Sequence, residues 1–215
     1  MQAQVRISQY IRAFDRSPLA KHEGQEPWAL TANSEAIVRG LLATLEAAEF
    51  LIAEEIAVHR SAVVEGGAVL KGPLILGAGS FVAAHAYLRG GNWVDSNCTF
   101  GPGAELKSSF VFSGTKLAHF NFVGDAVLGE GVNLEAGSII CNHRNERENK
   151  QVHVRCGAEL RPTGVEKFGA IVGDDCRIGA NAVLASGAVL ARGTVVGRAA
   201  LLDQELSPEV ARNRR

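Results

Sequence analysis

Aromatic residues form only 6% of this 215-residue sequence, and neither sign of charge predominates. The 22 Lys and Arg residues are balanced by 23 Asp and Glu residues, which gives a formal net charge of −1. A surface that binds nucleic acid needs a clustered basic excess, so we expect no nucleic-acid partner. Apolar residues nevertheless make up 47% of the sequence, enough for a sizeable core, which excludes a mainly disordered chain.

Long apolar runs are also lacking. The most apolar stretch, residues 41–58, is interrupted by four glutamates, and no segment reaches the roughly 18 apolar residues that span a bilayer. The first twelve residues carry no apolar run followed by a small-residue cleavage site, so no signal peptide is predicted. We therefore expect a cytoplasmic protein without a membrane partner.

Paired metal-ligand motifs are missing as well. The four cysteines are Cys98, Cys141, Cys156 and Cys176, and none of them belongs to a C-x-x-C pair. The six histidines contain no H-x₄-H pair. We therefore expect free thiols, no redox motif and no metal site.

What the sequence does contain is a six-residue repeat with 24 glycines. Every sixth residue is apolar over three runs, which are Ile52–Phe112, Phe122–Ile140 and Val172–Leu202. The first run has eleven consecutive hits, for which the chance probability at this composition is on the order of 10⁻⁴. An α-helix would need hits at spacings of three and four instead.

A strict period of six predicts a stacked all-β coil. Each hexad supplies one short strand and a turn, three hexads make an 18-residue triangular coil, and coils stack at roughly 4.8 Å. The apolar residues fill the prism, and the small residues and glycines turn its corners. We expect this parallel β-helix over residues 51–203, after a helical extension over residues 1–50 and before a tail over residues 204–215.

Two irregularities interrupt the repeat. The step from Phe112 to Phe122 is ten residues instead of twelve. A polar, charged insertion at about residues 143–167 should leave the coil as a loop, and its cluster Arg144–Lys150 is expected to be solvated.

The extension is expected to hold two helices. Gln2–Phe14 predicts a weak helix, and a second helix should begin at Asn33 or Ser34 and end near Glu49. The apolar face of the second helix would cover one open end of the β-helix. The tail Ser207–Arg215 is expected to fray.

The hexads resemble the left-handed parallel β-helix of the hexapeptide-repeat acyltransferases. The segment Glu105–Asn142 resembles the acetyltransferase domain of the bifunctional uridylyltransferase/glucosamine-1-phosphate acetyltransferases. The residues that match that family at unchanged spacing are Lys116, His119, Gly124, Asp125, Ala126, Gly129, Val132, Asn133, Ala136, Gly137, Ile139, Cys141 and Asn142. The resemblance implies a left-handed coil and a homotrimer with active sites in grooves between subunits.

The resemblance also implies roles for individual residues. His119 would be the general base, and Arg89 and Lys107 would bind a phosphate. Glu105 and Asn133 would contact the sugar or its amine, while Phe122, Asn142 and Lys167 would line the sugar pocket. Gly179, Ala180 and Arg198 would bind the acyl donor, acetyl-CoA.

The chemistry of acyl transfer agrees with these residue types. An amine that attacks a thioester must lose a proton, and histidine is a base suited to neutral pH. Arg89 and Lys107 are 18 residues apart, which is one coil, so the two cations should stack and need an anion nearby. Either Glu105 or Asp125 could fix the tautomer of His119, and the sequence does not choose between them.

The sequence also departs from the family. Phe122 stands where the family has a tyrosine, His143 follows Cys141-Asn142 where the family again has a tyrosine, and Gly179-Ala180 stands where it has Gly-Ser. The family's nucleotidyltransferase domain has no counterpart in these 215 residues.

The leading hypothesis is a CoA-dependent N-acyltransferase acting on an amino-sugar phosphate or a nucleotide-linked amino sugar. A non-catalytic trimerising or regulatory module that partners a separate sugar nucleotidyltransferase is one alternative. The other is a UDP-sugar acyltransferase that uses acyl carrier protein. Its basic docking strip would be Arg192, Arg198, Arg212, Arg214 and Arg215.

Overall fold

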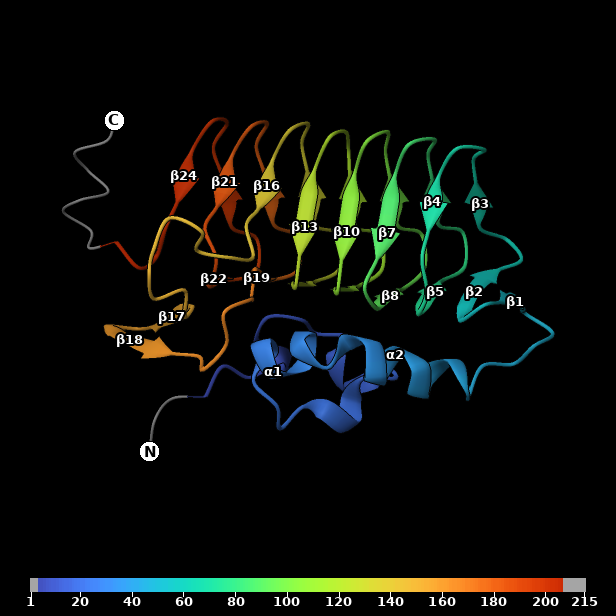
Figure 1. Ribbon diagram of the computed structural model, residues 1–215, viewed down its shortest axis with the longest axis horizontal. Coiled ribbons are helices and arrows are strands. Elements are labelled where there is room, and N and C mark those ends of the chain that lie inside the picture. Colours follow the sequence, from blue (N-terminus) through green and yellow to red (C-terminus); the bar gives the residue numbers. More distant parts are fainter. Residues whose placement is uncertain (1–3, 207–215) are drawn as a thin grey trace.

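The computed structural model describes residues 4–206, and its main body is a prism with three sheets as its sides (Figure 1). The predicted fraying of Ser207–Arg215 concerns residues outside this range. Except in the first pair of one sheet, neighbouring strands are parallel, with consecutive coils paired one above the other. The parallel all-β coil that the six-residue period predicts is confirmed.

Each side of the prism is one sheet. Sheet A contains β1 (Phe50–Ala53), β2 (Ile56–His59), β5 (Leu74–Leu76), β8 (Asn92–Val94), β11 (Phe110–Val111), β14 (Val127–Leu128), β19 (Ala170–Val172) and β22 (Ala188–Leu190). Sheet B contains β3 (Val63–Val64), β6 (Phe81–Val82), β9 (Thr99–Phe100), β12 (Lys116–Leu117), β15 (Asn133–Leu134), β20 (Arg177–Ile178) and β23 (Val195–Val196). Sheet C contains β4 (Val69–Leu70), β7 (Tyr87–Arg89), β10 (Glu105–Lys107), β13 (Phe122–Gly124), β16 (Ile139–Ile140), β21 (Val183–Leu184) and β24 (Leu201–Leu202).

The interior of the prism is a column of mostly aliphatic side chains. Leu88, Phe100 and Leu106 are fully buried there, as their place in the six-residue repeat predicts. Burying a side chain of this size contributes about 1.5–3 kcal/mol, so the column is the main source of the prism's stability.

The predicted register is wrong at two phenylalanines. The interior positions step from Leu106 to Val111 and from Val123 to Leu128, five residues each time, so Phe112 and Phe122 point out of the prism. What the sequence shows as one ten-residue step is therefore two separate one-residue deletions. Both fall at the corner where the chain passes from sheet C to sheet A, and the coils there repeat every 17 residues.

Phe112 faces outward because the outer surface of sheet A is itself a hydrophobic core. Its ring lies 6.2 Å from the ring of Phe14 and 5.2 Å from that of Trp93, centroid to centroid. Ile52, the first predicted interior residue, is also outside the prism. It lies on β1, which pairs antiparallel with β2, and it is 47% exposed.

The N-terminal extension lies along the outer face of sheet A and does not cover an end of the prism (Figure 1). It contains three 3-10 turns and two helices, which are η1 (Ile7–Gln9), η2 (Phe14–Arg16), η3 (Ala20–His22), α1 (Pro27–Ala32) and α2 (Ser34–Leu42). Between residues 4 and 14 there is one 3-10 turn where a helix was expected, and α2 ends at Leu42, before Glu49.

The position of the extension follows from an apolar row on sheet A. The buried outward residues of this row are Ala57, Ile75, Trp93, Phe110, Val127 and Ile171. A row this long needs a cover, and the apolar side chains of the extension supply it. Asp174 adds a polar tie, because its buried carboxylate accepts the backbone N–H groups of Arg12 and Glu130, both at 3.0 Å.

The insertion leaves the prism after Ile140 and returns at Ala170. It is only partly a loop, because β17 (His153–Cys156) and β18 (Glu159–Pro162) form an antiparallel hairpin. Its expected solvation is wrong for Arg144, whose side chain is 5% exposed. The guanidinium lies 2.7 Å from the Asp203 carboxylate and 3.3 Å from that of Glu205. The charged start of the insertion is thus fastened to the last coil.

No helix within residues 4–206 has the length and apolar character needed to cross a bilayer.

Candidate active site

One corner of the prism carries the predicted base and two of the residues predicted to bind the acyl donor. Leu117, Leu134, Ile178 and Val196 are Cα partners on four successive coils of sheet B. The residues two places after them turn the corner toward sheet C, and these are His119, Ala136, Ala180 and Arg198. His119 and Ala180 are therefore two coils apart on one edge, separated by the small side chain of Ala136.

His119 is exposed on this edge. Its carbonyl accepts the N–H of Gly137 at 2.9 Å, which holds the corner to the next coil. Within residues 4–206 its imidazole makes no hydrogen bond or ion pair. The two carboxylates considered for its tautomer are engaged elsewhere, Glu105 with Arg89 and Asp125 with Lys107.

Glu135 organises the donor end of the edge. Its carboxylate accepts the N–H of Ala180 at 2.9 Å and lies 2.9 Å from Nε of Arg198. The hydrogen bond from Arg198, followed by that from Ala180, lowers the pKa of Glu135. Asn133 and Gly179 line a cavity of about 270 Å³ beside this pair. The structure thus brings Asn133 together with Gly179, Ala180 and Arg198, the three residues predicted to bind the acyl donor.

The predicted phosphate-binding cations form a ladder on the outer face of sheet C. Arg89 and Lys107 are Cα partners on β7 and β10, which confirms the one-coil stacking. Each cation has its own carboxylate: Arg89 lies 2.6 Å from Glu105, and Lys107 donates to both oxygens of Asp125 at 3.0 and 2.9 Å. Neighbouring carboxylates therefore neutralise both charges.

Asp125 reaches Lys107 from the corner that follows β13. The coil repeats every 17 residues here, so the residue that pairs with Lys107 across the ladder is Gly124, and Asp125 begins the tightened corner. Ser108 and Asp125 both take the left-handed conformation at these corners, with φ of 48°. Asp125 is also the acceptor for the side-chain amide of Asn142.

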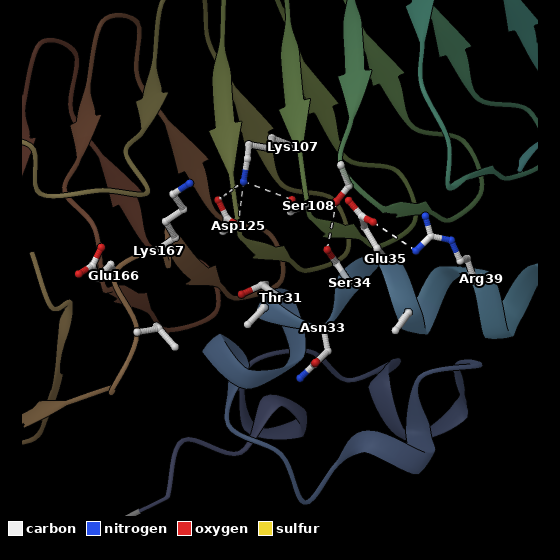
Figure 2. A pocket seen from close by; sticks show the side chains of 14 residues that line it. Thr31, Asn33, Ser34, Glu35, Arg39, Lys107, Ser108, Asp125, Glu166 and Lys167 are labelled. Carbon is white, nitrogen blue, oxygen red and sulfur yellow. Dashed lines mark hydrogen bonds and ion pairs between the residues drawn. The ribbon is translucent and has the colours of Figure 1, made fainter.

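A cavity of about 750 Å³ opens between this corner and the N-terminal extension (Figure 2). Lys107, Asp125 and Lys167 line it from the prism and the insertion. The wall from the extension includes Thr31, Asn33, Ser34, Glu35 and Arg39. Lys167 is exposed and has no ion-pair partner among the described residues.

A pair of glycines lets the extension approach this corner. Gly91 has φ of 85°, and a Cβ on it would lie 2.6 Å from the backbone N of Glu35. The hydroxyl of Ser34 donates to the carbonyl of Gly90 at 3.2 Å. No motif in the sequence marks the residues of the extension as site residues, although the Gly90-Gly91 pair is a signal for a close approach.

The remaining predicted residue, Phe122, points outward from sheet C between its strand neighbours Glu105 and Ile139, and it is half-buried. His119 lies at one end of this strand and Asp125 at the other. The base and the cavity therefore lie at opposite edges of sheet C, and the six residues that join them span at most about 20 Å.

No cluster of three or more His, Cys, Asp or Glu residues within residues 4–206 is arranged to hold a metal ion.

The chain is similar in sequence to several curated proteins named bifunctional protein GlmU. That of Carboxydothermus hydrogenoformans is 33% identical over 103 residues, 48% of this chain and 19% of the relative. That of Leifsonia xyli is 36% identical over 112 residues, 51% and 22% of the two chains. That of Pseudomonas fluorescens is 27% identical over 150 residues, 70% and 29%. The chain thus spans less than a third of these relatives, and over the matched part they confirm the resemblance.

Solved structures with a similar backbone trace superpose on this chain with low TM-scores. A hexapeptide transferase family protein from Anaplasma phagocytophilum has a TM-score of 0.37 and 18% identity, covering 74% of this chain and 83% of its own. The acetyltransferase domain of PglB from Neisseria gonorrhoeae, in complex with acetyl coenzyme A, has a TM-score of 0.37 and 14% identity, covering 78% and 60%. No protein-family profile matches the chain.

Proposed function

We propose that this chain is a CoA-dependent N-acyltransferase that transfers an acetyl group to an amino-sugar phosphate or a nucleotide-linked amino sugar, with His119 as the general base. The sequence similarity to the GlmU proteins supports the reaction class. The observation that carries the proposal is the shared edge of His119, Ala180 and Arg198, which come from distant parts of the sequence.

The proposed reaction is direct transfer. The amine lone pair attacks the thioester carbonyl carbon, the carbon–sulfur bond breaks, and CoA leaves as the thiolate. His119 takes the proton from the attacking nitrogen, a step that contributes about 10²–10⁴-fold in rate. The exposed edge and the small side chains of Ala136 and Ala180 leave room for a thioester beside the imidazole.

The acceptor is proposed to bind at the cavity between sheet C and the extension. Lys167 offers an unpaired cation for a phosphate, and Glu35 and Glu166 offer carboxylates for polar groups of the sugar. The width of sheet C separates this cavity from His119 of the same chain. This separation favours a nucleotide-linked acceptor, or a second copy of the prism that adds its own edge, as in the homotrimer that the resemblance implies.

Release of the CoA thiol tests the proposal. The purified protein is incubated with acetyl-CoA and a panel of amino-sugar 1-phosphates and UDP-, dTDP- and GDP-linked amino sugars. We expect release with one class of acceptor and a 10²–10⁴-fold loss for His119→Ala. His85→Ala is the matched control, because His85 is also an exposed histidine at a corner between sheets B and C. Equal rates in all three proteins would remove His119 as the base.

Lys167 provides a test of the acceptor site. We expect Lys167→Ala to raise KM for the acceptor about tenfold while KM for acetyl-CoA stays the same, because a charge-assisted hydrogen bond contributes about 1.5–3 kcal/mol. Lys150→Ala removes a lysine from the same insertion outside the cavity and should change neither constant. A KM for the acceptor that is unaffected by Lys167→Ala would place the acceptor elsewhere.

The non-catalytic alternative has one observation in its favour. The first end of the prism exposes Leu51, Ile52, Val63 and Val69, beside an apolar cavity of about 520 Å³. A surface of this kind suits contact with another protein, such as a separate nucleotidyltransferase. No thiol release with any acceptor, from a folded protein, would favour this alternative.

The carrier-protein alternative loses support. Arg198 is paired with Glu135, and Arg192 donates to the carbonyls of Ser8 and Tyr10, so neither arginine is free to form the basic docking strip. The other three arginines of the strip lie outside residues 4–206.

A further inference from the structure

The outer face of sheet B carries two cations that no carboxylate within residues 4–206 neutralises. Lys116, Asn133 and Arg177 are Cα partners on three successive coils, with the asparagine in the middle. Lys116 and Arg177 are exposed, and within residues 4–206 neither side chain makes a hydrogen bond or an ion pair. Arg89, Lys107 and Arg198 differ in this respect, since each of them is held by a carboxylate.

The two cations line one cavity of about 610 Å³. Its floor includes the corner glycines Gly114, Gly131 and Gly193, all with positive φ. Asp175 is the one carboxylate in the lining, and it lies 3.9 Å from the guanidinium of Arg12 in the extension. The cavity therefore keeps an excess of positive charge, and part of its lining is bare glycine backbone.

This cavity adjoins the one at the donor end of the site. Asn133 and Arg177 line both cavities, and the second also contains Gly179 and Arg198. A ligand can thus extend from Lys116 across sheet B to the edge that carries Ala180 and His119.

We propose that Lys116 and Arg177 bind the diphosphate group of a nucleotide, with the Asn133 amide between them. Their Cα atoms are two strand spacings apart, about 10 Å, and their long side chains can close on a group held above the asparagine. A guanidinium binds phosphate oxygens through paired N–H groups and an ammonium binds as a point charge, so the pair suits two linked phosphates better than one. The proposal takes its two candidate ligands, acyl-CoA and a nucleotide-linked amino sugar, from the proposed function.

Calorimetric titration tests this site. CoA, pantetheine, UDP, dTDP and GDP are each titrated into the wild-type protein and into Lys116→Ala and Arg177→Ala. We expect each substitution to lower the affinity for the diphosphate ligand about tenfold and to reduce the salt dependence of its binding. The affinity for pantetheine, which lacks phosphate, should not change. Lys21→Ala is the control, because it removes one exposed cation of the extension that lies outside both cavities.

The ligand that responds identifies the source of the diphosphate. Weakened CoA binding alone assigns the site to the acyl donor, and weakened binding of a nucleoside diphosphate alone assigns it to the acceptor. Unchanged affinity for all of these ligands in both variants would overturn the proposal, as would equal losses in Lys21→Ala.

Turnover separates this proposal from the proposed function. Thiol release that depends on His119, with KM values unchanged in Lys116→Ala and Arg177→Ala, would remove the diphosphate site and leave the acyltransferase in place. Diphosphate binding that is weakened in both variants of a protein that releases no thiol would support the diphosphate site and remove the acyltransferase.

Discussion

Lys107 donates to both carboxylate oxygens of Asp125 on the next coil of the prism, although its Cα partner across the ladder is Gly124. Gly124 stands opposite the lysine because the corner after β10 is one residue short, and Asp125 follows it at the start of the next corner. The same carboxylate accepts the amide of Asn142, so three coils meet at one buried group.

Removing the Asp125 carboxylate should lower the free energy of unfolding. Asp125→Asn leaves the Lys107 ammonium without its anion while its side chain remains 18% exposed. Breaking one side of a fully buried pair costs about 3–5 kcal/mol, and partial exposure reduces the figure here to about 1–3 kcal/mol. Urea unfolding measures the change, and Lys107→Met combined with Asp125→Asn completes a double-mutant cycle. Additive losses in the cycle would show that the two side chains are not coupled.

The contact between Arg144 and Asp203 predicts a dependence on acid. Burial alone would raise the pKa of Asp203, but the hydrogen bonds and the charge of Arg144 outweigh it and lower the pKa. A carboxyl whose pKa is lower in the folded state stabilises the fold above its unfolded pKa of about 3.9, and this contribution is lost as pH falls through the folded value.

We therefore expect the Tm of the wild-type protein to exceed that of Asp203→Asn at pH 7, and the difference to shrink below about pH 4. Asp15→Asn is the control, because Asp15 is exposed and has no ion-pair partner within residues 4–206. A Tm difference that stays constant from pH 7 to pH 3 would contradict the assignment.

The interior cysteines should resist alkylation. Burial raises the pKa of Cys98 to about 12 and also raises that of Cys176, and the thiolate is the reactive form. We expect iodoacetamide at pH 8 to leave both residues unmodified in the native protein and to modify all four cysteines after denaturation. Mass spectrometry of peptides reads the result. Rapid native labelling of Cys98 would mean that the prism opens on the timescale of the reaction.

Phe120, the neighbour of His119, is a bulky side chain in the left-handed conformation, with φ of 52° and 71% exposure. The left-handed conformation costs roughly 1–2 kcal/mol for most residues and less for asparagine. Phe120→Asn should therefore raise stability by about 1 kcal/mol in thermal unfolding. Phe120→Leu keeps the strain and should give no gain. A loss of stability in Phe120→Asn would show that the contact of the ring with Gly103 outweighs the strain.

The interior of the prism was predictable because each coil repeats the same physical requirement. Leu88 and Leu106 must fill the same triangular space, so the period appears directly in the sequence. The pattern wrongly places Phe112 inside the prism, because an apolar residue is also needed on the outer face of sheet A. Apolar character alone does not tell an interior position from an outer one.

The candidate site was predictable only where it depends on the repeat. The stacking of Arg89 and Lys107 follows from a spacing of one coil. Two stacked cations require a nearby anion, but the spacing does not identify which carboxylate pairs with which cation. The wall that Ser34 and Glu35 contribute depends on where the extension packs, and that depends on tertiary contacts that no local pattern of the sequence records.

The cover on sheet A also limits how copies of this protein can meet. A three-sided prism could touch three neighbours along its length, but the extension occupies one side from the coil of Ala57 to that of Ile171. Two flat sides remain, and they meet at the edge that carries His119. A body with two free sides has at most two lateral neighbours, so copies that meet along these sides would form a ring or a filament and would not spread into a layer.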